Sequence, residues 1–239
     1  MIEIEGIVLT ELKYGETSKI INILTPDLGI IGIYAKGACT LKSKTRPSTN
    51  KLVHSKFKIN YKKDKLSNLL EAEVINEFTT LRNDILKISY GNILLDLTNQ
   101  TAKENTNGMF ENLLNALLCI DKGLNPEAIT QIVMLKYLDN LGIAPYLDGC
   151  VECGSKEDII TISSDKGGYV CKNCIDKYNF VSNKALKLIK MYYLLDLKKL
   201  DKLEIKNDLS KEIDMFIEDY YQRYSGIYLK SKEFLKLVK

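Results

Sequence analysis

The first third of the chain consists of short apolar runs separated by turn residues. The first run covers residues 2–13, and Gly6 within it marks a sharp bend of the kind found where a strand of a small barrel turns a corner. Further runs lie at residues 20–24, 30–35, 53–61 and 66–74. This pattern predicts five strands that close into a small barrel, for which the OB-fold is the commonest five-stranded architecture.

Residues 53–61 alternate between apolar and polar side chains, as a half-buried strand does. One face carries Val53, Phe57, Ile59 and Tyr61, and the other carries His54, Lys56, Lys58 and Asn60. His54 is the one histidine of the chain, and its position among lysines predicts that it faces solvent or nucleic acid.

Beyond Phe78 the spacing of apolar residues becomes helical. Three helices are predicted in the first part of this region, at residues 84–103, 109–122 and 126–141. Three more are predicted near its end: one capped by Ser182 or Asn183 and running to Leu200, one capped by Asn207 or Asp208 and running to Tyr224, and a short one starting at Ser231. The predicted fold class is therefore α+β, with an OB-fold domain at residues 1–78 and an α-helical domain at residues 79–239.

Two CxxC motifs interrupt the helical region, one formed by Cys150 and Cys153 and the other by Cys171 and Cys174. The seventeen residues between them give a C-x2-C-x17-C-x2-C spacing, within the range of structural zinc sites, where two tight turns deliver four thiolates to one ion. Apolar residues between the motifs predict a small hairpin, as in a zinc ribbon. We expect a four-cysteine zinc knuckle at about residues 146–179, inserted in the helical domain.

Other kinds of site also use four cysteines. Disulfides need an oxidising compartment, and the first residues show no secretory signal region. An iron–sulfur cluster also takes four thiolates, and a CxxC motif can act as a redox pair. In a zinc site, the four sulfurs would fill all four coordination positions and leave none for water. The ion is therefore expected to have a structural and not a catalytic role.

Composition and missing motifs narrow the function classes. The chain has 45% hydrophobic and 27% charged residues, as globular proteins do, and no apolar run approaches the roughly twenty residues that cross a bilayer. The single histidine leaves no metal site with two histidines and no His-dependent triad, and neither a P-loop nor a GxGxxG motif is present. We therefore expect neither an enzyme nor a membrane protein, but a protein of the cytoplasm.

Charge is distributed unevenly, although the net charge is only +3. Residues 36–65 carry ten basic side chains against the single acid Asp64. Lysines attract a phosphate backbone and aromatic rings stack on bases, so this part of the barrel is the candidate nucleic-acid surface. The candidate contacts are Lys56, Lys58, the loop from Lys36 to Arg46, and the rings of Tyr34 and Tyr61. The alternative is that Tyr61 belongs to the barrel core and that the lysines only keep the other face solvated.

Short motifs in a fixed order resemble those of the RecO family of bacterial DNA repair and recombination proteins. They lie at residues 6–9, 14–16, 24–29, 35–38, 42–43, 71–73, 141–148, 150–154 and 167–168, followed by Cys171 and Cys174. The resemblance covers most of the chain and implies an N-terminal OB domain and a helical domain with a zinc knuckle.

The resemblance also implies a function. Members of this family bind single- and double-stranded DNA, anneal complementary strands and work with RecR, helping RecA to replace single-strand-binding protein, whose acidic tail they also contact. Carried over by position, the DNA-contacting residues are Lys36, Lys42, Lys44 and Arg46, with Lys56, Lys58 and Tyr34 as further candidates. Relatives often carry arginines where this chain has Cys39 and Thr40, so more of the affinity is expected from Lys56, Lys58 and lysines of the helical domain. The implied location is the bacterial cytoplasm, in association with the nucleoid.

Two functions of other classes remain as alternatives. In one, the barrel docks a protein partner and does not bind DNA directly, so that the chain is an interaction scaffold. In the other, scattered carboxylates such as Asp96 or Asp139 make a metal-dependent nuclease, although no clustered carboxylate motif is present.

Overall fold

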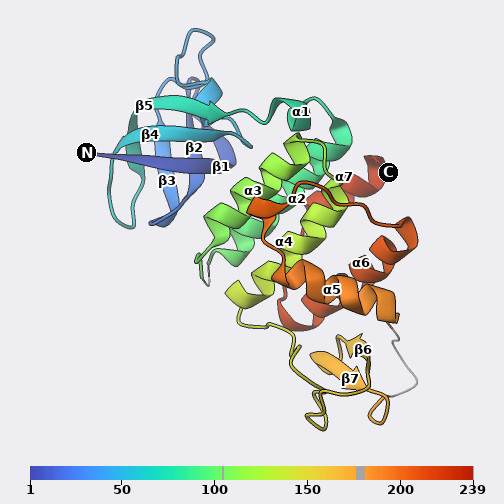
Figure 1. The fold of residues 1–239 in the computed structure, drawn as a ribbon. Helices are drawn as coiled ribbons and strands as arrows, with labels where there is room; N and C mark the ends of the chain where they lie inside the picture. The colour runs from blue at the N-terminus through green and yellow to red at the C-terminus, as the bar shows by residue number, and fades with distance from the viewer. Residues whose placement is uncertain (104, 176–180, 239) are drawn as a thin grey trace. The chain divides into compact units, whose positions relative to one another are not determined.

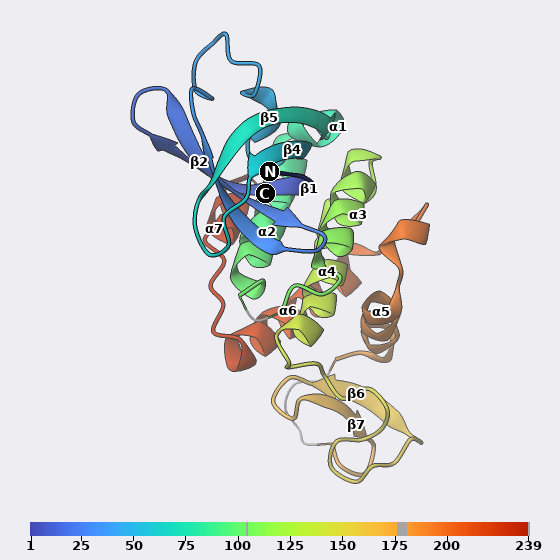
Figure 2. The same ribbon diagram turned by 90° about the vertical axis from the view of Figure 1, so that its left-hand side faces the viewer.

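The computed structural model describes residues 1–103, 105–175 and 181–238, and its chain divides into two compact units. The first unit combines residues 1–123 with Leu229–Lys239, and the second is Leu124–Tyr228. Figures 1 and 2 show the elements of both. The described helices include none that is long and apolar enough to cross a membrane.

A closed five-stranded barrel begins the first unit. Its strands are β1 (Ile2–Tyr14), β2 (Ser18–Thr25), β3 (Gly29–Ala35), β4 (His54–Asn60) and β5 (Ser67–Asn76), arranged in the order β1-β2-β3-β5-β4. The pairing is antiparallel except between β3 and β5, which run parallel. The core consists of β-branched and aromatic side chains from four strands: Val8, Ile21, Ile23, Ile31, Ile33, Phe57 and Ile59. The predicted five-stranded, OB-like barrel is thus confirmed.

The bend expected near Gly6 is present in β1. This strand pairs with β4 up to Ile7 and with β2 from Ile7 onward, so it turns from one neighbour to the other at this point. A Cβ on Gly6 would lie 2.7 Å from Cδ1 of Ile23. Glycine at this position allows β1 to pack closely against β2.

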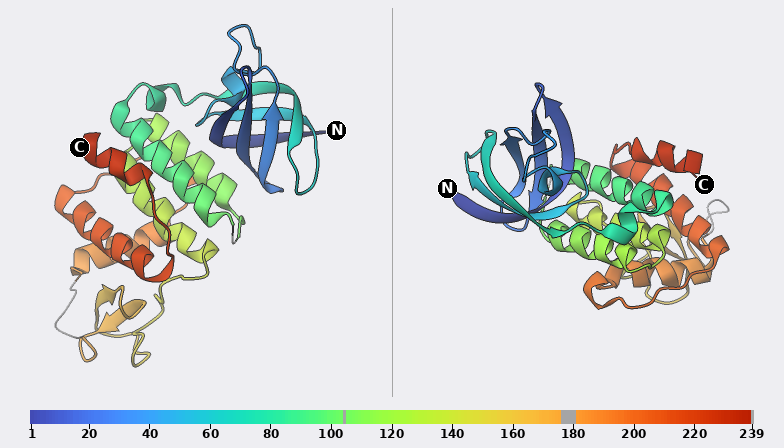
Figure 3. Two further views of the ribbon diagram at one scale, coloured as in Figure 1. Left: turned by 180° about the vertical axis from the view of Figure 1, so that it is seen from behind. Right: turned by 90° about the horizontal axis from the view of Figure 1, so that it is seen from above.

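Four helices complete the described part of the first unit: α1 (Thr79–Arg82), α2 (Ile85–Thr101), α3 (Met109–Asp121) and α7 (Ser231–Val238). Asp84 caps α2 by accepting hydrogen bonds from the backbone N–H groups of Leu86 and Lys87, at 2.9 and 3.0 Å. The C-terminal helix α7 packs along α2, as Figure 3 shows. The Ser231 hydroxyl joins the two helices by donating a 2.9 Å hydrogen bond to the Asp96 carboxylate.

The described part of the second unit contains three α-helices and a hairpin: α4 (Pro126–Asn140), α5 (Asn183–Leu194), α6 (Asn207–Tyr224), β6 (Ile159–Ser163) and β7 (Gly168–Cys171). Asn125 caps α4 by accepting hydrogen bonds from the N–H groups of Glu127 and Ala128. Gln131 of α4 donates hydrogen bonds to Ser210 and Asp214 of α6, and Tyr221 of α6 donates to the Met134 carbonyl at 2.7 Å. These buried contacts fix α4 against α6.

Three details differ from the sequence-based expectations. The helix predicted to reach Leu200 ends at Leu194, because the Asp196 side chain accepts from the Lys198 N–H and starts a separate 3-10 turn at Leu197–Lys199. Helix α6 begins at Asn207, so Lys206 and not Asn207 occupies its N-cap position. His54 does not face solvent, since it is only 4% exposed.

The burial of His54 has a structural cause. The alternation of β4 continues with Ser55, Phe57 and Ile59 buried, and its pairing with β1 runs without a register shift from His54 to Ile59, so the cause lies in what covers His54. The His54 ring contacts Phe110 of α3 edge to face and its Nε2 lies 2.6 Å from Oε1 of Glu5. The prediction of a solvent- or nucleic-acid-facing His54 is therefore wrong.

Candidate metal centre and nucleic-acid interface

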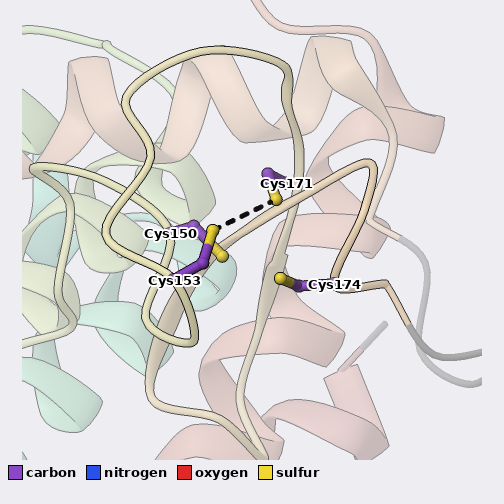
Figure 4. A group of neighbouring side chains, drawn as sticks. All are labelled: Cys150, Cys153, Cys171 and Cys174. Carbon is purple, nitrogen blue, oxygen red and sulfur yellow. Dashed lines mark hydrogen bonds between the residues drawn. The ribbon is translucent and has the colours of Figure 1, made fainter.

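The four cysteines of the CxxC motifs come together in the second unit. Their sulfur atoms all lie within 4.8 Å of one another, and Figure 4 shows Cys150 and Cys153 from one turn opposite Cys171 and Cys174 from the other. The sulfur atoms of Cys153 and Cys171 are 3.7 Å apart. Two sulfurs bound tetrahedrally at about 2.3 Å from one zinc ion would be separated by about 3.8 Å. The cluster thus has the donor set and the spacing to hold a single metal ion.

Hydrogen bonds of the backbone build the two turns. The first turn closes through Gly154 N–H to Cys150 O at 2.8 Å and Cys150 N–H to Ser155 O at 2.7 Å, with Gly154 at a φ of +74° that favours glycine. In the second turn, Cys174 N–H donates to Cys171 O at 3.1 Å. The predicted hairpin between the motifs is present as β6 and β7, and it places Cys171 at the end of β7.

Gly168 at the start of β7 holds the segment before the first motif against the hairpin. The backbone of Tyr146 crosses so close to Gly168 that a Cβ there would overlap Tyr146 O and lie 2.8 Å from Tyr146 N. Two 2.9 Å hydrogen bonds fix this crossing, from Tyr146 N–H to Gly167 O and from Tyr169 N–H to Tyr146 O. Glycine at this position therefore permits the contact that brings Cys150 beside Cys171.

The electrostatics of the cluster differ between its members. Burial raises the pKa of Cys150, but hydrogen bonds from the backbone N–H groups of Cys171, Cys153 and Glu152 together lower it to about 6. Hydrogen bonds with the thiols of Cys153 and Cys171 raise the pKa of Cys174 to about 12. Because backbone N–H groups stabilise its thiolate, Cys150 ionises easily and is suited to bind a cation before the other three cysteines do.

The hairpin is joined to the helices of its unit by its β6–β7 turn. Ser164 donates a hydrogen bond to Asp219 of α6, while Arg223 of α6 pairs with both Asp219 and Asp165 at 2.9 Å. Tyr224 donates to the Asp165 carbonyl at 3.0 Å. The candidate metal module is consequently anchored to the C-terminal half of α6.

The loop after β3 carries the predicted DNA contacts. We call residues 36–46 the basic loop; its cationic side chains, all exposed, are Lys36, Lys42, Lys44 and Arg46. Within the part of the chain that the structure describes, none of the four has an acidic side chain within 4.0 Å. Figure 2 shows the connection that contains the loop, in light blue, projecting from the barrel.

Hydrogen bonds hold the basic loop in a defined shape. The Cys39 N–H donates to Thr17 O at 2.8 Å, and the Thr49 hydroxyl donates to Thr45 O at 2.8 Å. Gly37, at a φ of +70°, donates its N–H to the Ser18 hydroxyl at 3.2 Å. The cations are thus carried by a backbone that is tied to the barrel at the start of the loop and to the turn at Pro47–Thr49 at its end.

Lys56 and Lys58 lie in a different electrostatic setting. In β4, Lys56 stands opposite Glu5 of β1 and Glu73 of β5, and Lys58 stands opposite Glu3 and Glu71. Ion pairs join Lys56 to Glu3 at 2.5 Å and Lys58 to Glu71 at 3.3 Å. A role of these lysines in DNA binding stays a prediction, and four neighbouring carboxylates weaken the attraction of this face for phosphates.

The two tyrosines considered for stacking are placed differently. The Tyr34 ring packs edge to face against Tyr14, with 5.8 Å between centroids, and its hydroxyl donates to Ser18. Tyr61 is 37% exposed and follows the last residue of β4, so it does not belong to the barrel core. Both rings remain candidates for base contacts.

Sequence reasoning missed one group of polar side chains. Lys51, Asn92 and Asn99 line a common cavity in the first unit, although they come from different segments. The only signal in the sequence was the pair of asparagines seven residues apart in a largely apolar helix, a spacing that places both on one helix face.

Comparison with known proteins gives a consistent result over nearly the whole chain. The family model described as "Recombination protein O N terminal" matches residues 1–78, and that described as "Recombination protein O C terminal" matches residues 82–233. Proteins named "DNA repair protein RecO" are similar: that of Bacillus pumilus is 33% identical over 98% of this chain and 93% of its own length. That of Halalkalibacterium halodurans is 32% identical, over 97% and 92%, and that of Bacillus cereus 31% identical, over 98% and 96%.

Proposed function

Because the chain belongs to the RecO family, we propose that it is a DNA repair and recombination mediator that binds DNA through the basic loop of its barrel. The observation that carries this proposal is the loop itself, with four exposed cations, no acidic partner among the described residues and a backbone fixed by hydrogen bonds. A fixed set of unpaired cations binds a phosphate backbone with little loss of conformational entropy.

The proposed mechanism requires no covalent step, so the protein is not an enzyme. Cations of the loop neutralise phosphates of single- or double-stranded DNA, and neutralising two strands lowers the repulsion that slows their pairing. Annealing of complementary strands is then accelerated by electrostatics and local concentration. Contacts to the backbone and to ring faces predict little sequence preference.

Partners follow from the family resemblance. We propose that the chain works with RecR to help RecA replace single-strand-binding protein on gapped DNA, and that it contacts the acidic tail of that protein. These activities place it in the bacterial cytoplasm at the nucleoid.

We further propose that the four cysteines hold one structural zinc ion. Cys150, Cys153, Cys171 and Cys174 would be its ligands, and a closed set of thiolates suits zinc as a folding element. Sulfurs within 4.8 Å of one another suit a single ion better than a cluster of several metal atoms, which would hold them farther apart. The ion would stabilise the two CxxC turns and hold them together.

The test is fluorescence-anisotropy binding of a labelled, mixed-sequence single strand over a range of salt concentrations. A variant with Lys36→Ala, Lys42→Ala, Lys44→Ala and Arg46→Ala is compared with the pair Lys56→Ala and Lys58→Ala. Each lost phosphate contact lowers the salt slope by about 0.7, so the loop variant should lose up to about 2.8. The salt slope of the Lys56→Ala/Lys58→Ala variant should fall much less, because glutamates already neutralise those two lysines.

Two outcomes would contradict the proposal. If the wild type does not bind at low salt, the barrel is not a DNA-binding domain and the interaction-scaffold function takes precedence. If the Lys56→Ala/Lys58→Ala variant lowers the salt slope as much as the loop variant does, DNA follows β4 and not the loop.

A further inference from the structure

A cavity of about 420 Å³ lies in the first unit, between β1, α2 and α7. This volume is within the range of roughly 300–1,000 Å³ typical of small-ligand sites. Its lining combines three apolar side chains with polar ones from four segments: Leu9, Thr10, Lys51, Asn92, Leu95, Asp96, Asn99, Lys230, Ser231 and Phe234. Neither the candidate metal centre nor the basic loop includes any of these residues.

Most of the polar groups in the cavity are available to a ligand. Among the described residues, the side chains of Lys51, Asn92, Asn99 and Lys230 have no hydrogen-bond or ion-pair partner. Asp96 is different, because its carboxylate accepts from Gln100 at 2.9 Å and from the Ser231 hydroxyl at 2.9 Å. The carboxylate therefore holds the walls together, while two amides and two ammonium groups are left to bind.

The environment of Lys51 favours an anionic ligand in the cavity. The side chain is half-buried, and burial lowers its pKa, an effect that Asp96 and Glu11 only partly oppose. A cation that has lost part of its hydration without gaining an ion pair gains most from an anionic ligand.

The chemistry of these groups selects a class of ligand. An asparagine amide donates and accepts at once, which matches the edge of a nucleobase, and it can pair with adenine at two atoms. Phe234, 49% exposed, offers a ring for stacking on a base, and the two lysines suit a phosphate. A divalent cation does not fit, because the lining carries one carboxylate and two ammonium groups.

We propose that this cavity binds one nucleotide, with the base between Phe234 and the amides of Asn92 and Asn99, and the phosphate at Lys51 and Lys230. The proposal rests on the proposed DNA binding, since Lys51 belongs to the same β3–β4 connection as the basic loop. A strand bound at the loop supplies the nucleotide by unstacking one base into the cavity. A free nucleotide has the same chemistry and is the second source to be tested.

The experiment compares two labelled 15-nucleotide strands, one with adenine bases and one with abasic residues, which carry the same phosphates. Wild type should bind the adenine strand about tenfold or more tightly, because stacking on an aromatic side chain contributes about 1–3 kcal/mol for each base. The Asn92→Ala/Asn99→Ala variant should lose a large part of this preference while keeping the wild-type salt slope. Alanine is the best helix former, so α2 should stay folded, and Phe234→Ala serves as the second variant.

Asn112→Ala/Asn115→Ala on α3 is the matched control and should behave as wild type, since neither asparagine lines the cavity. A parallel titration with deoxyadenosine monophosphate separates the sources: micromolar binding that the cavity variant loses would assign a free nucleotide, and its absence a strand nucleotide. If wild type binds both strands equally well and does not bind the mononucleotide, the cavity proposal is overturned while DNA binding stands. If wild type binds neither strand, DNA binding itself has failed.

Discussion

Gly168→Ala tests whether the backbone crossing at Tyr146 stabilises the candidate metal module. The new Cβ would lie 2.8 Å from both Tyr146 N and Cγ1 of Val151, so the Tyr146 segment has to move away. Overpacking of this kind costs about 1–3 kcal/mol. The two 2.9 Å hydrogen bonds of Tyr146 are weakened as well, at about 1 kcal/mol each. We expect a local destabilisation of about 3–5 kcal/mol.

Hydrogen–deuterium exchange of peptides from residues 146–171 measures this local stability. Since about 1.4 kcal/mol corresponds to a factor of ten, exchange in the module should accelerate roughly 100- to 5,000-fold. Gly154→Ala is the matched control: its φ is +74° and no atom lies within 4 Å of its Cβ, so only the conformational cost of about 1–2 kcal/mol applies. Equal acceleration in the two variants would refute the argument from close approach.

Two further predictions concern the metal ligands and the buried histidine. Cys150→Ser should lower the metal content below one equivalent per chain, measured by elemental analysis, and lower the melting temperature, measured by calorimetry. Cys39→Ser is the control, because Cys39 lies outside the cluster, and it should change neither value. Unchanged values for Cys150→Ser would contradict a folding role of the metal. Burial lowers the pKa of His54, although Glu5 opposes the shift, so the unfolded chain takes up the proton more readily and stability should fall as the pH drops below about 6.5. His54→Gln should reduce the change in the urea midpoint between pH 7 and pH 5, and an unchanged pH dependence would show that other groups cause it.

Local patterns were sufficient to predict the elements. Period-two alternation and turn residues indicated the barrel strands, and the CxxC spacing indicated that four cysteines meet at one site. Both features can be predicted because each depends on residues that are close together in the sequence. His54 is buried because Phe110 of α3 packs against it, and no pattern within residues 53–61 indicates that contact.

The electrostatic surroundings of the site could not be predicted in the same way. In the sequence, Lys56 and Lys58 belong to a run of basic residues. Strand pairing places them opposite glutamates that are distant in the sequence. The cavity shows the same limit, since Lys51, Asn92 and Phe234 meet only after the strand order and the return of α7 are known. Tertiary neighbours decide the charge of a surface, whereas a one-dimensional pattern describes only its composition.

The return of the C-terminal segment to the first unit also governs the order of events during synthesis. Leu229–Lys239 belong to the unit that begins at Met1, whereas Leu124–Tyr228 form the other unit in between. A ribosome therefore completes the whole second unit before it supplies the helix that packs along α2. Until then the nascent chain carries α2 without α7 along it, and the proposed nucleotide cavity lacks the wall formed by Lys230, Ser231 and Phe234.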